Sequence, residues 1–201
     1  MKINRFLKDY RIKGDGKKLK NILVINGHQK YGSAKGTLNQ TLMNKMISLL
    51  SEKNNIKTTN IQNGYKIEEE QQKFLWADII IYQTPIYWFS VPGLLKTYMD
   101  EVYAYGLFFK GADQYGRGGL LTEKKYMFST TWNAPEQAFN DPTQFFEGNS
   151  LEDTLSHLHR VQKFLGMKPL KSFTCYDVIK NPNIEKFVFE LDIHLKEVLD
   201  F

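Results

Sequence analysis

A glycine-rich loop close to the start of the chain has the composition of an anion-binding site. It extends from Gly27 to Thr37, reads GHQKYGSAKGT, and follows an apolar segment at 22–25. Glycines allow a backbone to approach a ligand, and the free amide groups at the start of a helix attract negative charge. We therefore predict that this loop binds the phosphate groups of a ligand.

Two common phosphate-binding motifs are absent from this loop. Gly27 and Gly32 have the spacing of a Walker A motif, but Ser33 stands where that motif requires its lysine. The pattern Gly-x-Gly-x-x-Gly is missing as well, so neither a nucleoside triphosphatase nor a Rossmann fingerprint is indicated. A compact mononucleotide loop would have more hydroxyl groups in fewer residues, so the loop favours a larger anion such as a pyrophosphate.

A second candidate site follows an apolar strand at 79–82. Pro85 cannot donate a backbone hydrogen bond and should end this strand, and Tyr87, Trp88 and Phe89 then place aromatic rings in the following turn. Ligands of open α/β sheets bind next to the carboxyl ends of the strands. We therefore interpret the turn as the wall of a site for a flat ligand; packing beneath a neighbouring loop is the alternative.

Residues capable of acid–base or metal chemistry are few. The histidines are His28, His157, His159 and His194, and none has metal-ligand spacing, so no metal site is predicted. The serines lack the sequence context of a catalytic nucleophile. A bound redox cofactor would supply the chemistry and require only binding and electrostatics from the protein.

The elements that must position these residues alternate between strands and helices. Apolar patterns predict strands at 22–25, 57–61, 79–82, 126–131 and 170–178, and helices at 38–50, 68–75, 92–103, 151–165 and 184–198. Thr37 is the expected N-cap of the first helix. The alternation predicts an α/β fold with a doubly wound five-stranded parallel sheet of order 2-1-3-4-5, which brings the glycine-rich loop and the aromatic turn to one crevice.

Length and charge indicate one globular domain with a basic leader. Of the 201 residues, residues 1–20 hold eight lysines and arginines against two acidic residues, whereas the remainder is close to neutral. We expect an extension at 1–19 and a domain at 20–201 that does not bind nucleic acid.

The sequence shows neither a membrane-spanning apolar run nor a signal peptide, so we expect a cytoplasmic location without stable membrane insertion. The single cysteine, Cys175, is expected to be a buried, inert thiol.

Several ordered motifs resemble those of the modulator of drug activity B group of NAD(P)H:quinone oxidoreductases, which have a flavodoxin-like fold. The matching segments are KNILVING, GTLNQTL, FLWADIIIYQTPIYW, VPGLLKTYMDEVY, YGRGGLL, KKYMFSTTWNAPEQAF, FLGMKPLKSF and DVIKNP, within residues 20–201. The resemblance implies FAD as cofactor, a cytoplasmic homodimer and two-electron reduction of quinones. NADPH is favoured over NADH as the electron donor.

The resemblance also implies which residues form the cofactor site. The FAD phosphates fall on Ser33, Gly36, Thr37, Leu38, Asn39 and Gln40, and the isoalloxazine ring falls on Pro85, Ile86, Tyr87 and Trp88, with Tyr115, Thr131, Trp132, Asn133 and Ala134 completing the site. Family members often carry Gly-Trp where this chain has Ile86 and Tyr87. The excursion before Tyr115 is also shorter in this chain.

We expect a ping-pong cycle in which NAD(P)H and then a quinone occupy one slot and a hydride passes through the flavin. Tyr115 or Tyr87 is the candidate catalytic residue that orients or protonates the quinone oxygen, although a tyrosine with an ordinary pKa of about 10 is a weak acid. Two other functions stay open. One is an FMN-dependent reductase, and the other is an ancillary regulatory subunit of a potassium-efflux transporter, a role that quinone-reductase-like proteins of this fold can have.

Overall fold

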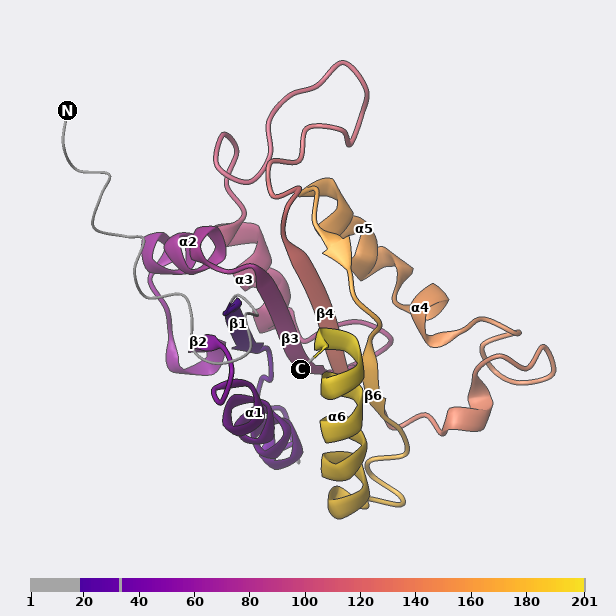
Figure 1. Ribbon diagram of the computed structural model, residues 1–201. Helices are drawn as coiled ribbons and strands as arrows, with labels where there is room; N and C mark the ends of the chain where they lie inside the picture. The colour runs from indigo at the N-terminus through magenta and orange to yellow at the C-terminus, as the bar shows by residue number, and fades with distance from the viewer. Residues whose placement is uncertain (1–18, 33, 201) are drawn as a thin grey trace, which may run out of the picture.

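A parallel β-sheet forms the centre of the molecule in the computed structural model, which describes residues 19–32 and 34–200 (Figure 1). The strands are β1 Asn21–Asn26, β2 Asn55–Asn60, β3 Ile79–Pro85, β4 Lys125–Thr131, β5 Lys168–Pro169 and β6 Phe173–Cys175. Their order is β2-β1-β3-β4-β5, with β6 also paired to β4. The predicted order is thus confirmed. Ser33 and all of the predicted leader except Leu19 lie outside the described residues.

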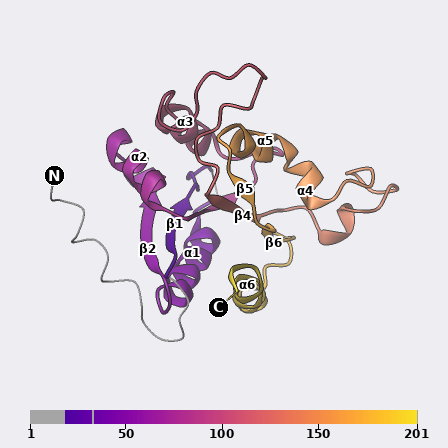
Figure 2. The same ribbon diagram turned by 45° about the horizontal axis from the view of Figure 1, so that its top comes forward.

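Helices cover both faces of the sheet. They are α1 Thr37–Leu50, α2 Ile67–Trp76, α3 Gly93–Val102, α4 Leu151–Thr154, α5 Ser156–Phe164 and α6 Ile184–Leu199, with short 3-10 helices η1 Ile61–Asn63 and η2 Glu136–Ala138. Figure 2 shows α1 and α6 on one side of the strands and α2, α3 and α5 on the other. A strand between two helical layers is buried on both faces, which explains the continuous apolar runs of β1 and β3.

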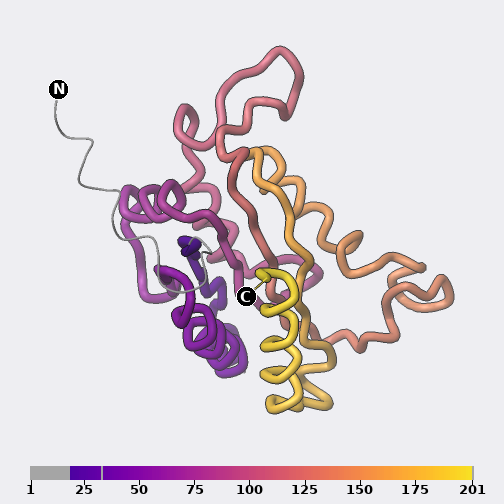
Figure 3. Tube along the Cα trace, viewed as in Figure 1, coloured from indigo at the N-terminus to yellow at the C-terminus, as the bar shows by residue number. Residues whose placement is uncertain are grey.

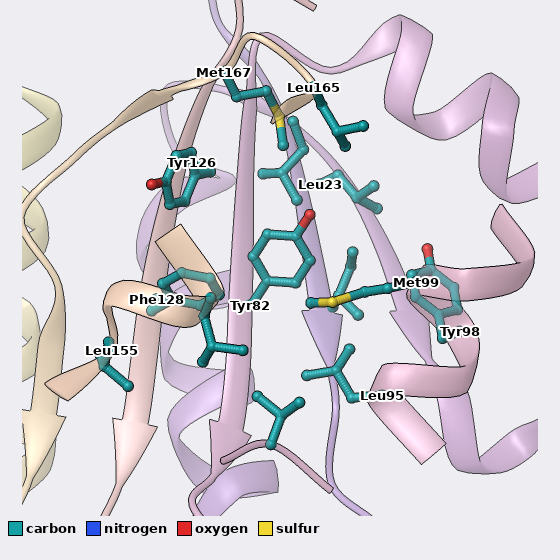
Figure 4. Close-up of a cluster of buried hydrophobic side chains, with 14 of the residues drawn as sticks. Leu23, Tyr82, Leu95, Tyr98, Met99, Tyr126, Phe128, Leu155, Leu165 and Met167 are labelled. Carbon is teal, nitrogen blue, oxygen red and sulfur yellow. The ribbon is translucent and has the colours of Figure 1, made fainter. Parts of the chain in front are cut away.

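Each face of the sheet has its own apolar core. Leu42 and Met46 of α1 and Leu191 of α6 pack on one face, whereas the other face packs against α2, α3 and α5. Figure 4 shows the second core, with Tyr82 of β3 near its centre. The Tyr82 hydroxyl lies 2.7 Å from the Tyr103 hydroxyl, so this buried ring keeps a hydrogen-bond partner.

Two predicted elements differ in the structure. Of the strand predicted at 170–178 only β6 is formed, while β5 precedes the predicted range, and between them the Ser172 amide donates to the Glu152 side chain at 2.9 Å. The helix predicted at 151–165 is interrupted at Leu155, whose φ of −87° and ψ of 5° are not helical. The apolar period continues across this break, since Leu155 and Leu158 are both buried. Periodicity alone therefore could not reveal it.

The start of α1 differs by one residue from the prediction. Thr37 is the first helical residue, and the N-cap is Gly36 with a φ of 80°. Glycine adopts this left-handed conformation without steric cost. A Cβ atom at Gly36 would also overlap with the His28 imidazole, so the close approach of the loop to the helix requires glycine.

The prediction for Cys175 is confirmed. Its side chain is buried at the end of β6, and burial raises the pKa of the thiol well above its ordinary value. Within residues 19–32 and 34–200, no helix is both long enough and apolar enough to cross a membrane.

Candidate functional site

The carboxyl ends of β1, β3 and β4 lie side by side at one edge of the sheet. Asn26 is in register with Gln83, and Pro85 at the end of β3 is in register with Thr131 at the end of β4. The connections that leave these strand ends are the glycine-rich loop, the aromatic turn and the segment after Thr131. The structure therefore brings together the three segments that hold most of the predicted site residues.

A buried chain of polar side chains joins these strand ends to α1. The Gln83 amide donates to Asn39 Oδ1 at 2.8 Å, and the Ser129 hydroxyl donates to Gln83 Oε1 at 2.7 Å. Asn39 Nδ2 in turn donates to the Thr131 hydroxyl at 3.3 Å. Buried polar groups that are fully paired fix one arrangement of the elements that carry them. Asn39 and Thr131 thus lie in contact, and both belong to the predicted site.

Gln83 and Ser129 were not predicted as site residues. The available signal was a polar side chain within an otherwise apolar strand, and both are completely buried. Such residues are expected where a sheet edge must align the first turn of a helix with neighbouring strands. Neither side chain is exposed, so they support the site rather than contact a ligand.

A polar cavity of about 320 Å³ lies at the start of α1. Its lining comes from the ends of β1 and β2, from the glycine-rich loop and from the first turn of α1: Asn26, His28, Lys30, Lys35, Gly36, Thr37, Gln40, Thr41, Asn60 and Gln62. Among the residues that the structure describes, no side chain caps the helix at this end, so its first amide groups are available to a ligand. Two lysines and a positive helix end make the cavity suitable for an anion.

His28 is, with Asn26, a buried group of this cavity. Its side chain is 6% exposed, and Nε2 has no hydrogen-bond partner within the described part of the chain. Burial lowers the pKa of His28, and the charge of Lys30 lowers it further, against a backbone hydrogen bond at Ala34 that raises it. Beside a helix start and two lysines, this unpaired ring nitrogen can donate to a phosphate oxygen once a bound anion favours the protonated ring. The sequence prediction named the loop but not His28 as a ligand residue.

The predicted phosphate-binding residues differ in exposure. Thr37 is exposed at the cavity, and Gln40 is half-buried and accepts a hydrogen bond from Asn26 at 3.2 Å. Leu38 packs against the apolar core on the α1 side of the sheet, so only its backbone amide is available to a ligand.

The aromatic turn after β3 has an uncommon conformation. Tyr87 and Ser90 exchange two backbone hydrogen bonds, of 2.8 and 3.2 Å, across the turn. Trp88 and Phe89 between them have φ angles of 48° and 65°, a left-handed conformation that non-glycine residues rarely adopt. The Trp88 side chain is 90% exposed. An exposed indole held in a strained backbone is typical of a functional site.

Contacts to neighbouring segments hold this turn. The Ile86 amide donates to the Thr131 carbonyl at 3.0 Å, and the Tyr87 hydroxyl donates to the Gln29 carbonyl at 3.0 Å. Burial raises the pKa of Tyr87 above its ordinary value. The Tyr87 hydroxyl therefore links the turn to the glycine-rich loop.

In the segment after β4, backbone groups and not an aromatic side chain lie at the site. The Trp132 side chain is 3% exposed and packs edge-on against Phe139, with ring centroids 5.4 Å apart. Its indole therefore belongs to the core, whereas Asn133 is exposed and Ala134 is half-buried at the strand end. The backbone carbonyls of Trp132 and Ala134 accept hydrogen bonds from the segment that follows β6.

Tyr115 lies at the opposite edge of the sheet. It belongs to the excursion 104–124, which starts after α3 and leads into the amino end of β4; Figure 3 shows this excursion projecting from the molecule. The Tyr115 side chain is 94% exposed, and its ring is 6.0 Å from that of Phe164 at the end of α5. Within one chain the structure does not bring Tyr115 to Tyr87 or to the other predicted site residues.

The sequence model of the family described as "Flavodoxin-like fold" matches residues 20–195. The match covers most of the chain, which therefore belongs to the flavodoxin-like fold family. The chain is 39% identical over 189 residues to NADPH:quinone oxidoreductase MdaB of Haemophilus influenzae, which covers 89% of this chain and 98% of that protein. The predicted resemblance to the modulator of drug activity B group is thereby confirmed.

Other relatives share the fold at a range of distances. An uncharacterized protein of Schizosaccharomyces pombe is 41% identical over 188 residues, covering 88% of this chain and 96% of its own. NAD(P)H:quinone oxidoreductase from Methanothermobacter marburgensis superposes with a TM-score of 0.69 at 13% identity, covering 92% and 98% of the two chains. General stress protein 14 of Treponema denticola, solved in complex with FMN, gives a TM-score of 0.62 at 18% identity, covering 90% and 96%.

Proposed function

We propose that this protein is a flavin-dependent oxidoreductase that reduces quinones with NAD(P)H. The observation that carries the proposal is the presence, at one sheet edge, of a polar cavity at the start of α1 and an exposed aromatic turn after β3. A flavin nucleotide has the same two parts, a phosphate-bearing chain and a flat ring system. The similarity to NADPH:quinone oxidoreductase MdaB supports a quinone as acceptor and NADPH as the preferred donor.

The cavity at the start of α1 favours FAD over FMN in this proposal. FMN has one phosphate, which the first amides of α1 could bind alone. The cavity continues beyond these amides to Asn60 and Gln62, at the end of β2 and away from the aromatic turn. His28 Nε2 and the lysines Lys30 and Lys35 would serve a second phosphate and its nucleoside. Because the Treponema denticola relative was solved with FMN, an FMN-dependent reductase is the alternative.

Each segment would then have a distinct task. Gly36, Thr37, Leu38, Asn39 and Gln40, with Ser33, would bind the phosphates, and Pro85, Ile86, Tyr87 and Trp88 would bear the flavin ring beside Thr131, Asn133 and Ala134. A bound flavin supplies the chemistry, because it accepts a hydride from NAD(P)H and returns it to the quinone. Backbone amides at the turn and the strand ends would stabilise negative charge on the ring edge.

Substrates would use one slot in turn, which is a ping-pong cycle. The aromatic turn offers the exposed indole of Trp88, on which either substrate could stack. Tyr87 would act as a positioning residue, because its hydroxyl is bound to the Gln29 carbonyl. A homodimer and a cytoplasmic location are further parts of this proposal.

Two measurements test it. Purified protein is expected to be yellow and to release FAD, identified by chromatography against FMN, on denaturation. Double-reciprocal plots with varied NADPH and menadione are expected to give parallel lines. Colourless protein that cannot be reconstituted with either flavin would refute the proposal, release of FMN would select the alternative cofactor, and intersecting lines would refute the ping-pong cycle.

A further inference from the structure

Two phenylalanine side chains stack on each other at the surface beside the aromatic turn. The rings of Phe89 and Phe145 have centroids 5.5 Å apart and are inclined by only 18°. Phe145 is 71% exposed and Phe89 is 48% exposed. Exposed aromatic rings that gather next to a binding site usually mark contact with an apolar ligand or partner.

Hydrogen bonds and a buried ring fix the loop that carries the exposed Phe145 side chain. Asp141 organises this loop, since its side chain accepts from the Thr143 amide at 2.8 Å and its carbonyl accepts from the Gly148 amide at 3.0 Å. The neighbouring Phe146 is buried and stacks on Phe139, with centroids 4.3 Å apart. Phe146 therefore anchors the loop, whereas Phe145 is exposed. The loop itself projects from the molecule beyond η2 (Figure 1).

The backbone at Phe89 is also held in a defined conformation. Phe89 is held at a left-handed φ of 65°, which places its ring against Phe145 and also 6.1 Å from the ring of Phe146. The Ser90 hydroxyl lies 3.2 Å from His157 Nε2, so α5 supports the turn as well. Two separate loops thus converge to keep one apolar surface in place.

The two ends of the site differ in character. The cavity at the start of α1 is lined by Lys30, Lys35, Asn60 and other polar residues. The end next to Trp88 continues into the apolar surface of Phe89 and Phe145. If a ligand bound against Trp88 carries an apolar chain, burial of that chain against Phe145 would remove its apolar surface from water, which is favourable.

Building on the proposed function, we propose that Phe145, together with Phe89, forms the outer wall of the quinone slot and determines its substrate class. The wall favours quinones that carry an apolar chain, such as a prenyl chain, over quinones with a bare ring. Phe145 is then a specificity-determining residue that contacts the chain of the substrate and takes no part in hydride transfer.

The test compares two naphthoquinones, menadione and a 2-methyl-naphthoquinone with a short prenyl chain, on the flavin-loaded Phe145→Ala variant. We expect kcat/KM for the prenylated quinone to fall about tenfold while kcat/KM for menadione, the flavin content and the KM for NADPH stay unchanged. Phe145→Leu, which keeps an apolar side chain, is expected to recover most of the loss. Phe189→Ala is the matched control, since Phe189 is 65% exposed on α6, which lies on the opposite side of the sheet from α3 and α5 (Figure 2).

Three results would overturn this assignment. They are an equal loss for both quinones, no loss for the prenylated quinone, and a change in molecular mass that shows Phe145 to be a contact between copies of the chain. Quenching of tryptophan fluorescence by the prenylated quinone separates this inference from the proposed function. If wild type binds this quinone more tightly than Phe145→Ala does but turns over neither quinone, the proposed function fails while the chain-binding wall is retained.

Discussion

His28 illustrates how a side chain that is suited to bind a ligand can lower the stability of the ligand-free protein. Its imidazole is buried, and Nε2 lacks a partner in the described ranges. A buried polar atom without a hydrogen bond costs about 1–3 kcal/mol. The charge of Lys30 makes protonation of His28 still less favourable, so the ligand-free site holds an uncharged ring whose protonation an anionic ligand would favour.

The lowered pKa of His28 leads to a prediction about stability and pH. Below the ordinary pKa of 6.5 the unfolded chain protonates this residue, whereas the folded chain does not until its lower pKa is reached. The unfolded state thus binds more protons, and the free energy of unfolding falls as the pH falls below 6.5. Urea unfolding of flavin-free protein at several pH values should show a smaller fall for His28→Gln than for wild type. Equal slopes in the two proteins would contradict this origin.

At the scale of elements, the aromatic turn combines strain with exposure. A left-handed conformation costs a non-glycine residue about 1–2 kcal/mol, and Trp88 has little packing to offset it because it is 90% exposed. Asparagine tolerates this conformation better. We therefore expect Trp88→Asn to raise the free energy of unfolding by about 1 kcal/mol and to weaken flavin retention. Thermal melts and flavin content measured on the same preparation check both effects, and a variant that melts lower would show that the turn is not strained.

A buried carboxylate joins β2, α2 and α3. Glu70 is 2% exposed and accepts hydrogen bonds of 2.7 Å each from Thr59, Tyr98 and Lys73. Burial and the charge of Glu70 raise the pKa of Tyr98 well above its ordinary value, so the tyrosine stays a donor. Glu70→Ala leaves these donors without their acceptor and is expected to cost about 3–5 kcal/mol in urea unfolding. The neighbouring Glu69, paired with exposed Lys66, is the control, and Glu69→Ala should unfold like wild type.

The sequence predicts elements well where one residue pattern decides them. The apolar runs of β1 and β3 and the proline at the end of β3 are local signals, and the structure follows them. The break at Leu155 and the N-cap at Gly36 depend on backbone angles that an apolar pattern does not encode. Gln83 and Ser129 were missed for another reason, because their role arises only from pairing between strands that are distant in the sequence.

At the scale of the whole molecule, the predicted site is spread over both edges of the sheet. Tyr115 is near the amino ends of the strands, whereas Trp88 lies at their carboxyl ends. Sequence comparison assigned both to one site because it carries no information on which edge, or which subunit, supplies a residue. The sheet lies between them, so no side-chain movement within one chain can join them. If Tyr115 belongs to the site, a second copy must supply it.

Mixed dimers provide the decisive measurement for this arrangement. We expect the protein to elute as a dimer of the 23.5 kDa chain, and Trp88→Ala and Tyr115→Ala to be poorly active as homodimers. A mixed dimer with one variant on each subunit should recover about half of the wild-type activity, since Trp88 of one subunit meets Tyr115 of the other at one intact site. The reciprocal control places both substitutions on one subunit and pairs it with wild type, which spoils both sites and should abolish the recovery. Recovery in the reciprocal pair alone would place Tyr115 and Trp88 of the same chain in one site, and a monomeric mass would exclude shared sites altogether.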